Sequence, residues 1–357
     1  MPDPSYDALL VVGFGGPEKM DDVIPFLENV LRGRNVPRER MLEVARHYEQ
    51  FNGVSPINAQ MCGLIAALKP ELAAHQIALP IYWGNRNWHP LLTDTLRAMT
   101  ASGVQRALAY VSSAYSSYSG CRQYLGDIDR ARQAAGDLAP PVDKLRVFYN
   151  HPLFVAASAA RLAAALEQVP SDRRDRMHVA FTAHSISVAQ AETCQYETQL
   201  RETCRLTAGK IQLEPSRWQL VYQSRSGRPE DPWLGPDIGD HLRSVATRGV
   251  STVVVMPIGF LSDHLEVLYD LDCEARQIGA DLGLTMIRAA TVGTHPLFVQ
   301  VIRELIQERL SGGGSRAAVG EFAAWPDACP PDCCPAPARA RHGRSSSSPS
   351  PRQGDSK

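Results

Sequence analysis

Short apolar runs alternate along this chain with longer stretches of helical periodicity, and this alternation constrains the fold more than any other feature. The runs are four to six residues long and end in polar or turn residues, which is typical of parallel strands covered on both faces. The expected strands span residues 8–12, 80–83, 107–112, 145–149, 178–182, 219–222, 252–257 and 284–287. Amphipathic helices are expected between them, at residues 58–72, 91–101, 152–166 and 236–248.

The expected strands fall into two sets of four, which predicts an α/β protein with two doubly wound, Rossmann-like lobes. Each lobe would contain a parallel four-stranded sheet flanked by helices. We expect the lobes at residues 1–160 and 161–311, with a last helix at 296–310 able to pack back on the first lobe. A linker and cysteine-rich segment would follow at 312–335, and a disordered Pro, Ala, Arg and Ser tail at 336–357. No sequence repeat is strong enough to prove a duplication.

Charge and hydropathy exclude several classes of partner. The chain has 37 Lys and Arg residues and 38 Asp and Glu residues, so it lacks the excess positive charge expected of a protein that binds nucleic acid. No run approaches the roughly 20 apolar residues of a membrane span, and the first residues do not resemble a signal peptide. We therefore expect a soluble cytoplasmic protein that recognises its partner through a local site.

A glycine-rich turn, Gly13-Phe-Gly-Gly-Pro17, follows the first expected strand. A dinucleotide-binding loop is disfavoured, because Pro17 and Glu18 follow where a third glycine is required and Pro17 has no amide for a phosphate. Two explanations remain open. The glycines can let the backbone approach a flat ligand, or they can form a tight turn between a strand and a helix.

His184 lies just beyond the apolar run at residues 178–182. Ligands of α/β sheets bind beyond the carboxyl ends of the strands, where a neutral imidazole can accept a proton or bind a metal. A purely structural histidine is the alternative.

Four carboxylates, those of Asp263, Glu266, Asp270 and Glu274, follow the strand expected at 252–257. On an α-helix they would share one face, where like-charged neighbours cost roughly 0.2–0.5 kcal/mol per pair. Such a row favours a divalent cation or bound protons. The alternative is a solvated acidic face at a helix start, with Asp263 and Glu266 as a capping box.

Three of the eight cysteines, Cys329, Cys333 and Cys334, crowd into one short segment. This crowding favours zinc or an iron–sulfur cluster over disulfides, and a fourth ligand would have to come from elsewhere in the chain. A cysteine-bearing tail without metal is the alternative.

Together these segments resemble the ferrochelatase family over nearly all of residues 6–311. The motifs that carry the resemblance are Gly13-Phe-Gly-Gly-Pro17, Tyr48 with Gly53-Val-Ser-Pro-Ile57, Tyr82-Trp-Gly-Asn-Arg-Asn-Trp-His-Pro90, Thr182-Ala-His-Ser-Ile186 and Ser262-Asp-His-Leu-Glu-Val-Leu-Tyr269. The last two are highly specific in combination.

The resemblance implies a chelatase fold and an enzyme of haem biosynthesis whose substrates are a porphyrin and Fe²⁺. It implies that His184 and Glu266 bind the metal and carry the catalysis, with Asp263 and Asp270 on an accessory path for iron or protons. His264 and Glu274 would lie on the same path. The implied porphyrin contacts are Phe14, Tyr48, Ser55 and Tyr124. Transient contacts with other enzymes of the haem pathway are also expected.

The tail resembles the subset of ferrochelatases that hold a [2Fe-2S] cluster with one ligand far upstream. Cys121 matches that upstream position, and Cys329, Cys333 and Cys334 would complete the set.

The bacterial character of the sequence suggests coproporphyrin III as the substrate, with iron coproporphyrin III as the product. Phe14 and His47 stand where enzymes of this route often have tyrosine and arginine, so the details of substrate binding are open. Arg32 and Arg34 are candidates for carboxylate recognition. The alternatives are a protoporphyrin IX ferrochelatase, a chelatase for another tetrapyrrole or metal, and a noncatalytic porphyrin or haem carrier.

Overall fold

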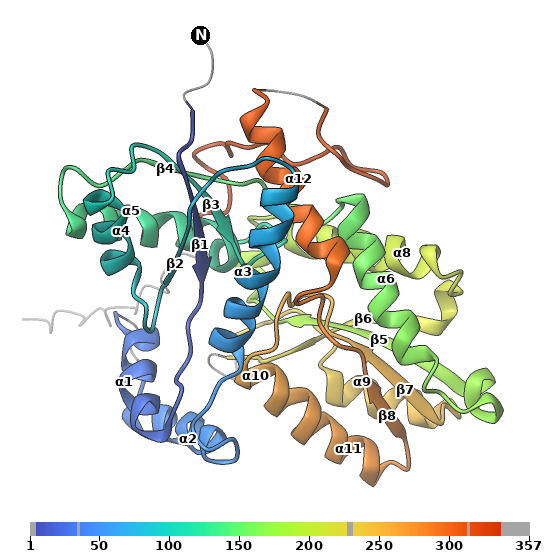
Figure 1. The fold of residues 1–357 in the computed structure, drawn as a ribbon. Coiled ribbons are helices and arrows are strands. Elements are labelled where there is room, and N and C mark those ends of the chain that lie inside the picture. Colours follow the sequence, from blue (N-terminus) through green and yellow to red (C-terminus); the bar gives the residue numbers. More distant parts are fainter. Residues whose placement is uncertain (1–4, 34–35, 227–230, 313–314, 337–357) are drawn as a thin grey trace, which may run out of the picture.

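The chain forms two four-stranded sheets, seen in a computed structural model that describes residues 5–33, 36–226, 231–312 and 315–336 (Figure 1). The first sheet has the order β2-β1-β3-β4 and the second β6-β5-β7-β8, and every neighbouring pair is parallel. The α/β prediction is thus confirmed. The strands are β1 (Ala8–Gly13), β2 (Ile81–Asn85), β3 (Ala107–Val111), β4 (Val142–Lys144), β5 (Met177–His184), β6 (Trp218–Gln223), β7 (Thr252–Met256) and β8 (Thr285–Arg288).

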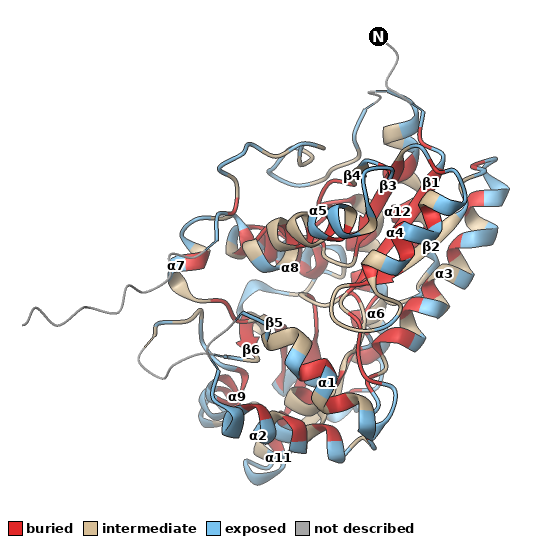
Figure 2. Ribbon diagram, turned by 90° about the vertical axis from the view of Figure 1, so that its left-hand side faces the viewer, coloured by how far each residue is buried: buried red, intermediate tan, exposed pale blue. Residues whose placement is uncertain are grey.

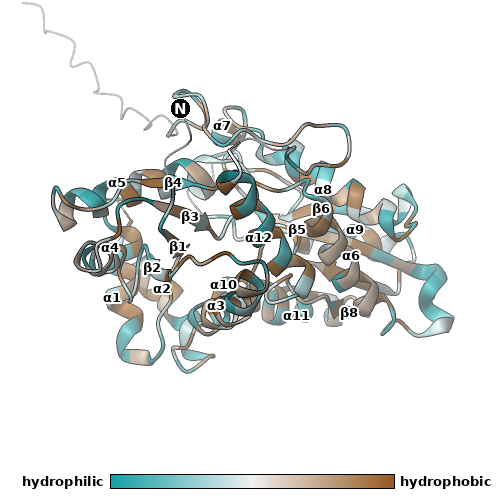
Figure 3. Cartoon of the chain, turned by 45° about the horizontal axis from the view of Figure 1, so that its top comes forward, coloured by the Kyte–Doolittle hydropathy of each residue, from teal (hydrophilic) through white to brown (hydrophobic). Residues whose placement is uncertain are grey.

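Helices cover both faces of each sheet, and their apolar and polar stripes alternate around the surface (Figure 3). The α-helices are α1 (Met20–Leu31), α2 (Arg38–Glu49), α3 (Ile57–Ala74), α4 (Leu92–Ala101), α5 (Gln123–Ala135), α6 (Pro152–Leu166), α7 (Val188–Ala191), α8 (Tyr196–Lys210), α9 (Ile238–Thr247), α10 (Leu265–Val267), α11 (Arg276–Asp281) and α12 (Pro296–Leu310). Two π-helices, η1 (Tyr118–Arg122) and η4 (Leu268–Ala275), and two 3₁₀-helices, η2 (Ser171–Arg176) and η3 (Pro215–Arg217), complete the set. Within the described ranges, no helix is both long and apolar enough to cross a bilayer.

The two halves repeat one structural plan. The pentapeptide His-Pro-Leu-Phe-Val occurs at residues 151–155 and 295–299, where it starts the helix that follows each sheet. In both copies the histidine Nδ1 accepts a hydrogen bond from the leucine amide at 3.3 Å, and proline occupies the first helical turn. The two four-stranded sheets also have equivalent strand orders.

Burial on both faces explains why the strands are almost continuously apolar (Figure 2). Leu10 and Val12 of β1 pack against α4 and α5, whereas Leu9 and Val11 face a larger core. That larger core is shared, because it also contains Val179 and Phe181 of β5. One apolar interior therefore joins the two sheets.

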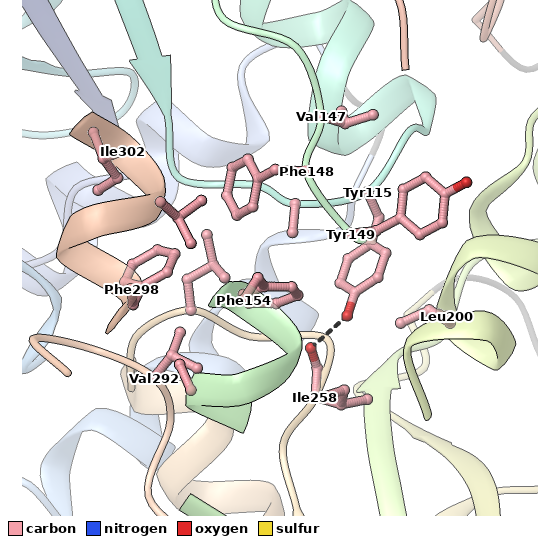
Figure 4. Close-up of a cluster of buried hydrophobic side chains, with 14 of the residues drawn as sticks. Tyr115, Val147, Phe148, Tyr149, Phe154, Leu200, Ile258, Val292, Phe298 and Ile302 are labelled. Carbon is pink, nitrogen blue, oxygen red and sulfur yellow. Dashed lines mark hydrogen bonds between the residues drawn. The ribbon is translucent and has the colours of Figure 1, made fainter. Parts of the chain in front are cut away.

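Aromatic rings from several segments fill this shared core (Figure 4). Phe154 of α6 lies edge-on to Phe148 with ring centroids 5.5 Å apart, and it also contacts Phe298 of α12 at 6.1 Å. Tyr115 reaches the second half of the chain, where its hydroxyl donates to the Ile258 carbonyl at 2.8 Å.

The prediction of a strand at residues 145–149 is wrong. The fourth strand is Val142–Lys144, and its ladder ends when the Leu145 amide binds the Ala109 carbonyl at 2.9 Å. The following residues, Val147, Phe148 and Tyr149, leave the sheet edge and enter the shared core. Their apolar character reflects burial, which needs no partner strand.

The expected boundary between residues 160 and 161 falls inside α6. Helix α12 packs against both α3 and α6. Residues 313–314 of the expected linker, and the expected disordered tail from residue 337 onward, lie outside the described residues.

Beyond α12, residues 315–336 form a strap that runs back over the body of the protein. Buried Arg146 binds Glu308 at 2.8 Å and donates to the Ala317 carbonyl at 2.9 Å. Asn150 donates to the Phe322 carbonyl at 2.8 Å, and the Glu321 amide donates to Glu202 at 2.9 Å. The C-terminal segment is therefore packed against the body at least as far as Cys334, which is buried.

We expect Phe154→Ala to lower the free energy of unfolding by about 3–5 kcal/mol, because it leaves a cavity among rings that cannot close the gap. Phe154 is 1% exposed, whereas Leu138, the matched control, is 83% exposed. Leu138→Ala should change stability by less than about 0.5 kcal/mol. Chemical denaturation followed by circular dichroism measures both, and equal effects would contradict the shared core described here.

Candidate functional site

The centre of the site forms where the chain beyond β7 crosses the end of β5. Parallel pairing places Phe181 of β5 opposite Met256, the last residue of β7. The Gly259 amide then donates to the Thr182 carbonyl at 3.0 Å. A Cβ atom on Gly259 would lie 2.6 Å from the Ala183 Cβ, so only glycine permits this approach.

This crossing brings the predicted pair together. His184 ends β5, and its Nε2 lies 3.7 Å from Oε2 of Glu266, with the two side chains 36% and 47% exposed. The His184 Nδ1 lies 2.5 Å from the Ser185 carbonyl oxygen, which can only accept a hydrogen bond. Nδ1 must therefore carry the proton in the neutral ring, and the Nε2 lone pair points toward Glu266, available for a metal or a proton.

Tyr196 fixes the backbone at this point. Its buried hydroxyl donates to the His184 carbonyl at 3.1 Å. The imidazole is thus held by hydrogen bonds at its own ring and at its main chain.

Glu266 lies in α10, and Asp270 and Glu274 continue its side into the π-helix η4. Burial and then the Glu266 charge raise the pKa of Asp270 to about 7, although hydrogen bonds from Ser224 and Gln223 oppose the shift. Asp270 can therefore exchange a proton near neutral pH. These three carboxylates are close enough to act on one another, as the predicted acidic row requires.

The inclusion of Asp263 in that helical row is wrong. The helix begins at Leu265 after extended backbone at His264, so Asp263 lies outside it, and the His264 side chain makes no capping hydrogen bond. Asp263 instead pairs with Arg288 at 3.0 Å, and Arg288 also binds Asp272 at 2.9 Å. The Arg288 charge neutralises Asp263, which no longer needs a cation. The capping box that was the alternative for Asp263 and Glu266 is also absent.

The backbone of the glycine-rich turn packs closely against other residues of the protein. A Cβ on Gly13 would lie 2.4 Å from Oδ1 of Asn85, and one on Gly16 would lie 2.8 Å from the Ser55 Cβ. Asn58 donates to the Gly16 carbonyl at 3.2 Å. Packing against Asn85 and Ser55 accounts for these glycines, and their approach to a flat ligand stays a prediction.

Two of the predicted porphyrin contacts lie beside Glu266. The Ser55 hydroxyl accepts a hydrogen bond from the Leu265 amide at 3.3 Å, at the start of the helix that carries Glu266. Tyr48 is buried, and burial followed by the Glu266 charge raises the pKa of its hydroxyl. Residues of the first half of the chain thus reach the carboxylate of the second.

The other two predicted porphyrin contacts, Phe14 and Tyr124, lie on either side of Arg86. Its guanidinium lies 5.8 Å from the Phe14 ring centroid and 4.3 Å from that of Tyr124, and it pairs with Asp127. Sequence reasoning quoted Arg86 only as part of a motif and gave it no role. A basic residue just past the end of β2 was the signal that could have singled it out.

Of the arginines considered for carboxylate recognition, Arg32 is exposed and binds the Asn29 side chain. Arg34 lies outside the described residues.

The four cysteines of the predicted cluster meet where the strap crosses η1. Cys121 is buried and hydrogen-bonds Cys329, and Cys333 Sγ lies 3.3 Å from Cys334 Sγ. Hydrogen bonds from Cys121 and from the Trp325 indole lower the pKa of Cys329, which favours its thiolate. Arg122, next to Cys121, donates to the Pro331 carbonyl at 2.7 Å and ties the strap to this helix.

Across the described residues, no three His, Cys, Asp or Glu side chains are arranged around a single metal ion. This finding covers the four cysteines as well as His184 and Glu266.

Known proteins resemble this chain over most of its length. The Ferrochelatase family profile matches residues 6–310. A ferrochelatase from Rhodopirellula baltica is 53% identical over 332 residues, covering 93% of this chain and 94% of the relative. Coproporphyrin III ferrochelatases from Streptomyces griseus and Nocardia farcinica are 48% and 50% identical, covering 94% and 86% of this chain and 95% and 89% of the relatives.

Among solved structures, SirB from Bacillus subtilis with Fe³⁺ superposes with a TM-score of 0.53 at 12% identity, covering 86% of this chain and 96% of that chain. This likeness concerns the fold alone. The profile match over most of the chain, together with relatives about half identical along nearly their whole length, establishes that this chain belongs to the ferrochelatase family.

Proposed function

We propose that this chain inserts Fe²⁺ into coproporphyrin III to give iron coproporphyrin III, in haem biosynthesis. The observation that carries the proposal is the solvent-accessible His184–Glu266 pair, with Nε2 and Oε2 3.7 Å apart. The names of the Streptomyces and Nocardia relatives support the choice of porphyrin.

Insertion exchanges two pyrrole N–H protons for one Fe²⁺, so the site must accept protons as well as metal. The His184 Nε2 lone pair is placed to take a proton. Asp270, with a pKa near 7, and Glu274 extend a path that carries protons away and brings iron in. A noncatalytic carrier needs no proton acceptor, so Asp270 favours an enzyme.

The surrounding aromatic and hydroxyl groups would orient the macrocycle. The Ser55 hydroxyl binds the Leu265 amide next to Glu266, and the Glu266 charge acts on the Tyr48 hydroxyl. Phe14 and Tyr124 flank Arg86. A flat porphyrin keeps its nitrogen lone pairs in its own plane, so walls that favour a puckered ring would lower the barrier to insertion.

The choice of substrate is tested by anaerobic Fe²⁺ insertion into coproporphyrin III and protoporphyrin IX in parallel. We expect a higher kcat/KM for coproporphyrin III, read from the absorbance change on metallation. A preference for protoporphyrin IX would overturn the assigned porphyrin, and no insertion into either would overturn the proposed activity.

Removal of the central pair should stop turnover. We expect His184→Ala to lower kcat by roughly 10²–10⁴-fold, since the proton acceptor is lost. Glu266→Gln should reduce turnover more than porphyrin affinity. His75→Ala and Glu214→Gln, which change exposed residues elsewhere, serve as matched controls and should retain activity. Normal turnover by His184→Ala would refute its role.

We also propose that Cys121, Cys329, Cys333 and Cys334 hold a [2Fe-2S] cluster. Four thiols are the ligand set that such a cluster requires, and one of them already favours the thiolate form. When bound, the cluster would cross-link the strap to η1. The insertion chemistry described above requires no electron transfer, so its role would be structural.

Anaerobically purified protein should contain iron and acid-labile sulfide and show a visible absorption band. Cys121→Ser should lose this band and lower the melting temperature, because the strap loses its anchor. Cys62→Ser, which alters an exposed thiol on α3, should keep both. A folded wild-type protein without iron or sulfide would rule out the cluster.

A further inference from the structure

One aromatic contact between the two halves of the chain has no assigned role. His47 of α2 stacks on Tyr269 of η4, with ring centroids 3.8 Å apart and planes within 7° of parallel. His47 precedes Tyr48, whereas Tyr269 lies between Glu266 and Glu274 along the helix that carries the acidic row. The contact therefore joins the N-terminal helix pair to the metal-handling helix.

Tyr269 is in turn linked to the far end of the row. Burial, followed by the charge of Glu274 and a hydrogen bond with it, raises the pKa of Tyr269. A chain of contacts thus runs from His47 through the Tyr269 ring to the Glu274 carboxylate.

The neighbouring contacts act elsewhere on this helix. The Ser55 hydroxyl binds the Leu265 amide, and Met41 and Tyr48 pack with the Leu265 side chain, all at the helix start. The His47 stack lies about one turn farther along, beyond Glu266 and next to Asp270.

Such a restraint has a physical purpose in an acidic row. Glu266, Asp270 and Glu274 follow one another at four-residue spacing along this helix, and their like charges repel one another before a cation arrives. Carboxylates that are free to separate must be gathered again when the ion binds. Ligands held in place beforehand bind a cation more tightly, because the cost of ordering them is already met.

We propose that His47 is a positioning residue that holds Tyr269, and through it Glu274, and thereby sets the affinity for incoming Fe²⁺. This inference rests on the proposed ferrochelatase activity. It assigns His47 to the metal path, with no direct contact to the ion.

The test measures KM separately for Fe²⁺ and for coproporphyrin III in His47→Ala, His47→Phe and wild-type enzymes. The usual strength of an aromatic pair corresponds to roughly a two- to tenfold rise in the iron KM for His47→Ala. The porphyrin KM should change by less than about twofold, which is the smallest effect expected from the loss of an aromatic pair. His47→Phe keeps a flat ring and should restore the wild-type iron KM. A general folding defect would instead lower kcat without this split.

A double-mutant cycle tests whether His47 acts through Tyr269. Once Tyr269→Ala is present, adding His47→Ala should raise the iron KM no further, because the stack is already lost. Additive effects would overturn the proposal, as would an unchanged iron KM in His47→Ala or a failure of His47→Phe to rescue it in a protein of normal melting temperature.

His75→Ala, at the far end of α3, controls for the loss of an imidazole and should match the wild type. The wild-type assay separates the two claims. Absence of metallation by wild-type enzyme would reject the proposed function, whereas normal wild-type turnover with an insensitive His47→Ala variant would reject only the role of His47.

Discussion

The parallel pairing of β5 with β7 is the constraint on which the site depends. It places the ends of both strands at one edge, where His184 terminates β5 and the chain leaving β7 crosses over it at Gly259. Backbone hydrogen bonds of the sheet therefore fix His184 and the start of the segment that leads to Glu266, and the Ser55 hydroxyl holds the helix that carries Glu266.

The two halves contribute different chemistry to this edge. In the proposed reaction the second sheet would supply the groups that handle metal and protons, and the first half would supply the rings and hydroxyls of Phe14, Tyr48, Ser55 and Tyr124. The shared apolar core and the Ser55–Leu265 hydrogen bond join the two halves. Packing would thus couple substrate orientation to metal handling.

Much of this arrangement could be predicted from the sequence, because strand periodicity is local. Seven of the eight strands lie where they were expected, and His184 meets Glu266 because both follow strands of one sheet. The failures required knowledge of distant partners. Asp263 leaves the acidic row to bind Arg288, and residues 145–149 are apolar because the shared core covers them. The repeated pentapeptide at residues 151 and 295 was readable in the sequence, yet its meaning needed the equivalent helices of the structure.

The strap imposes an order on how the molecule is completed during synthesis. The residues that bind the strap, Arg146, Asn150 and Glu202, leave the ribosome long before the strap itself is translated. The Arg122–Pro331 hydrogen bond joins residues 209 positions apart. The body of the protein can fold while the strap is still being translated, because domains fold as their residues emerge. Closure at η1 therefore cannot precede translation of the strap. A newly made Cys121 stays a free thiol until that segment has been translated.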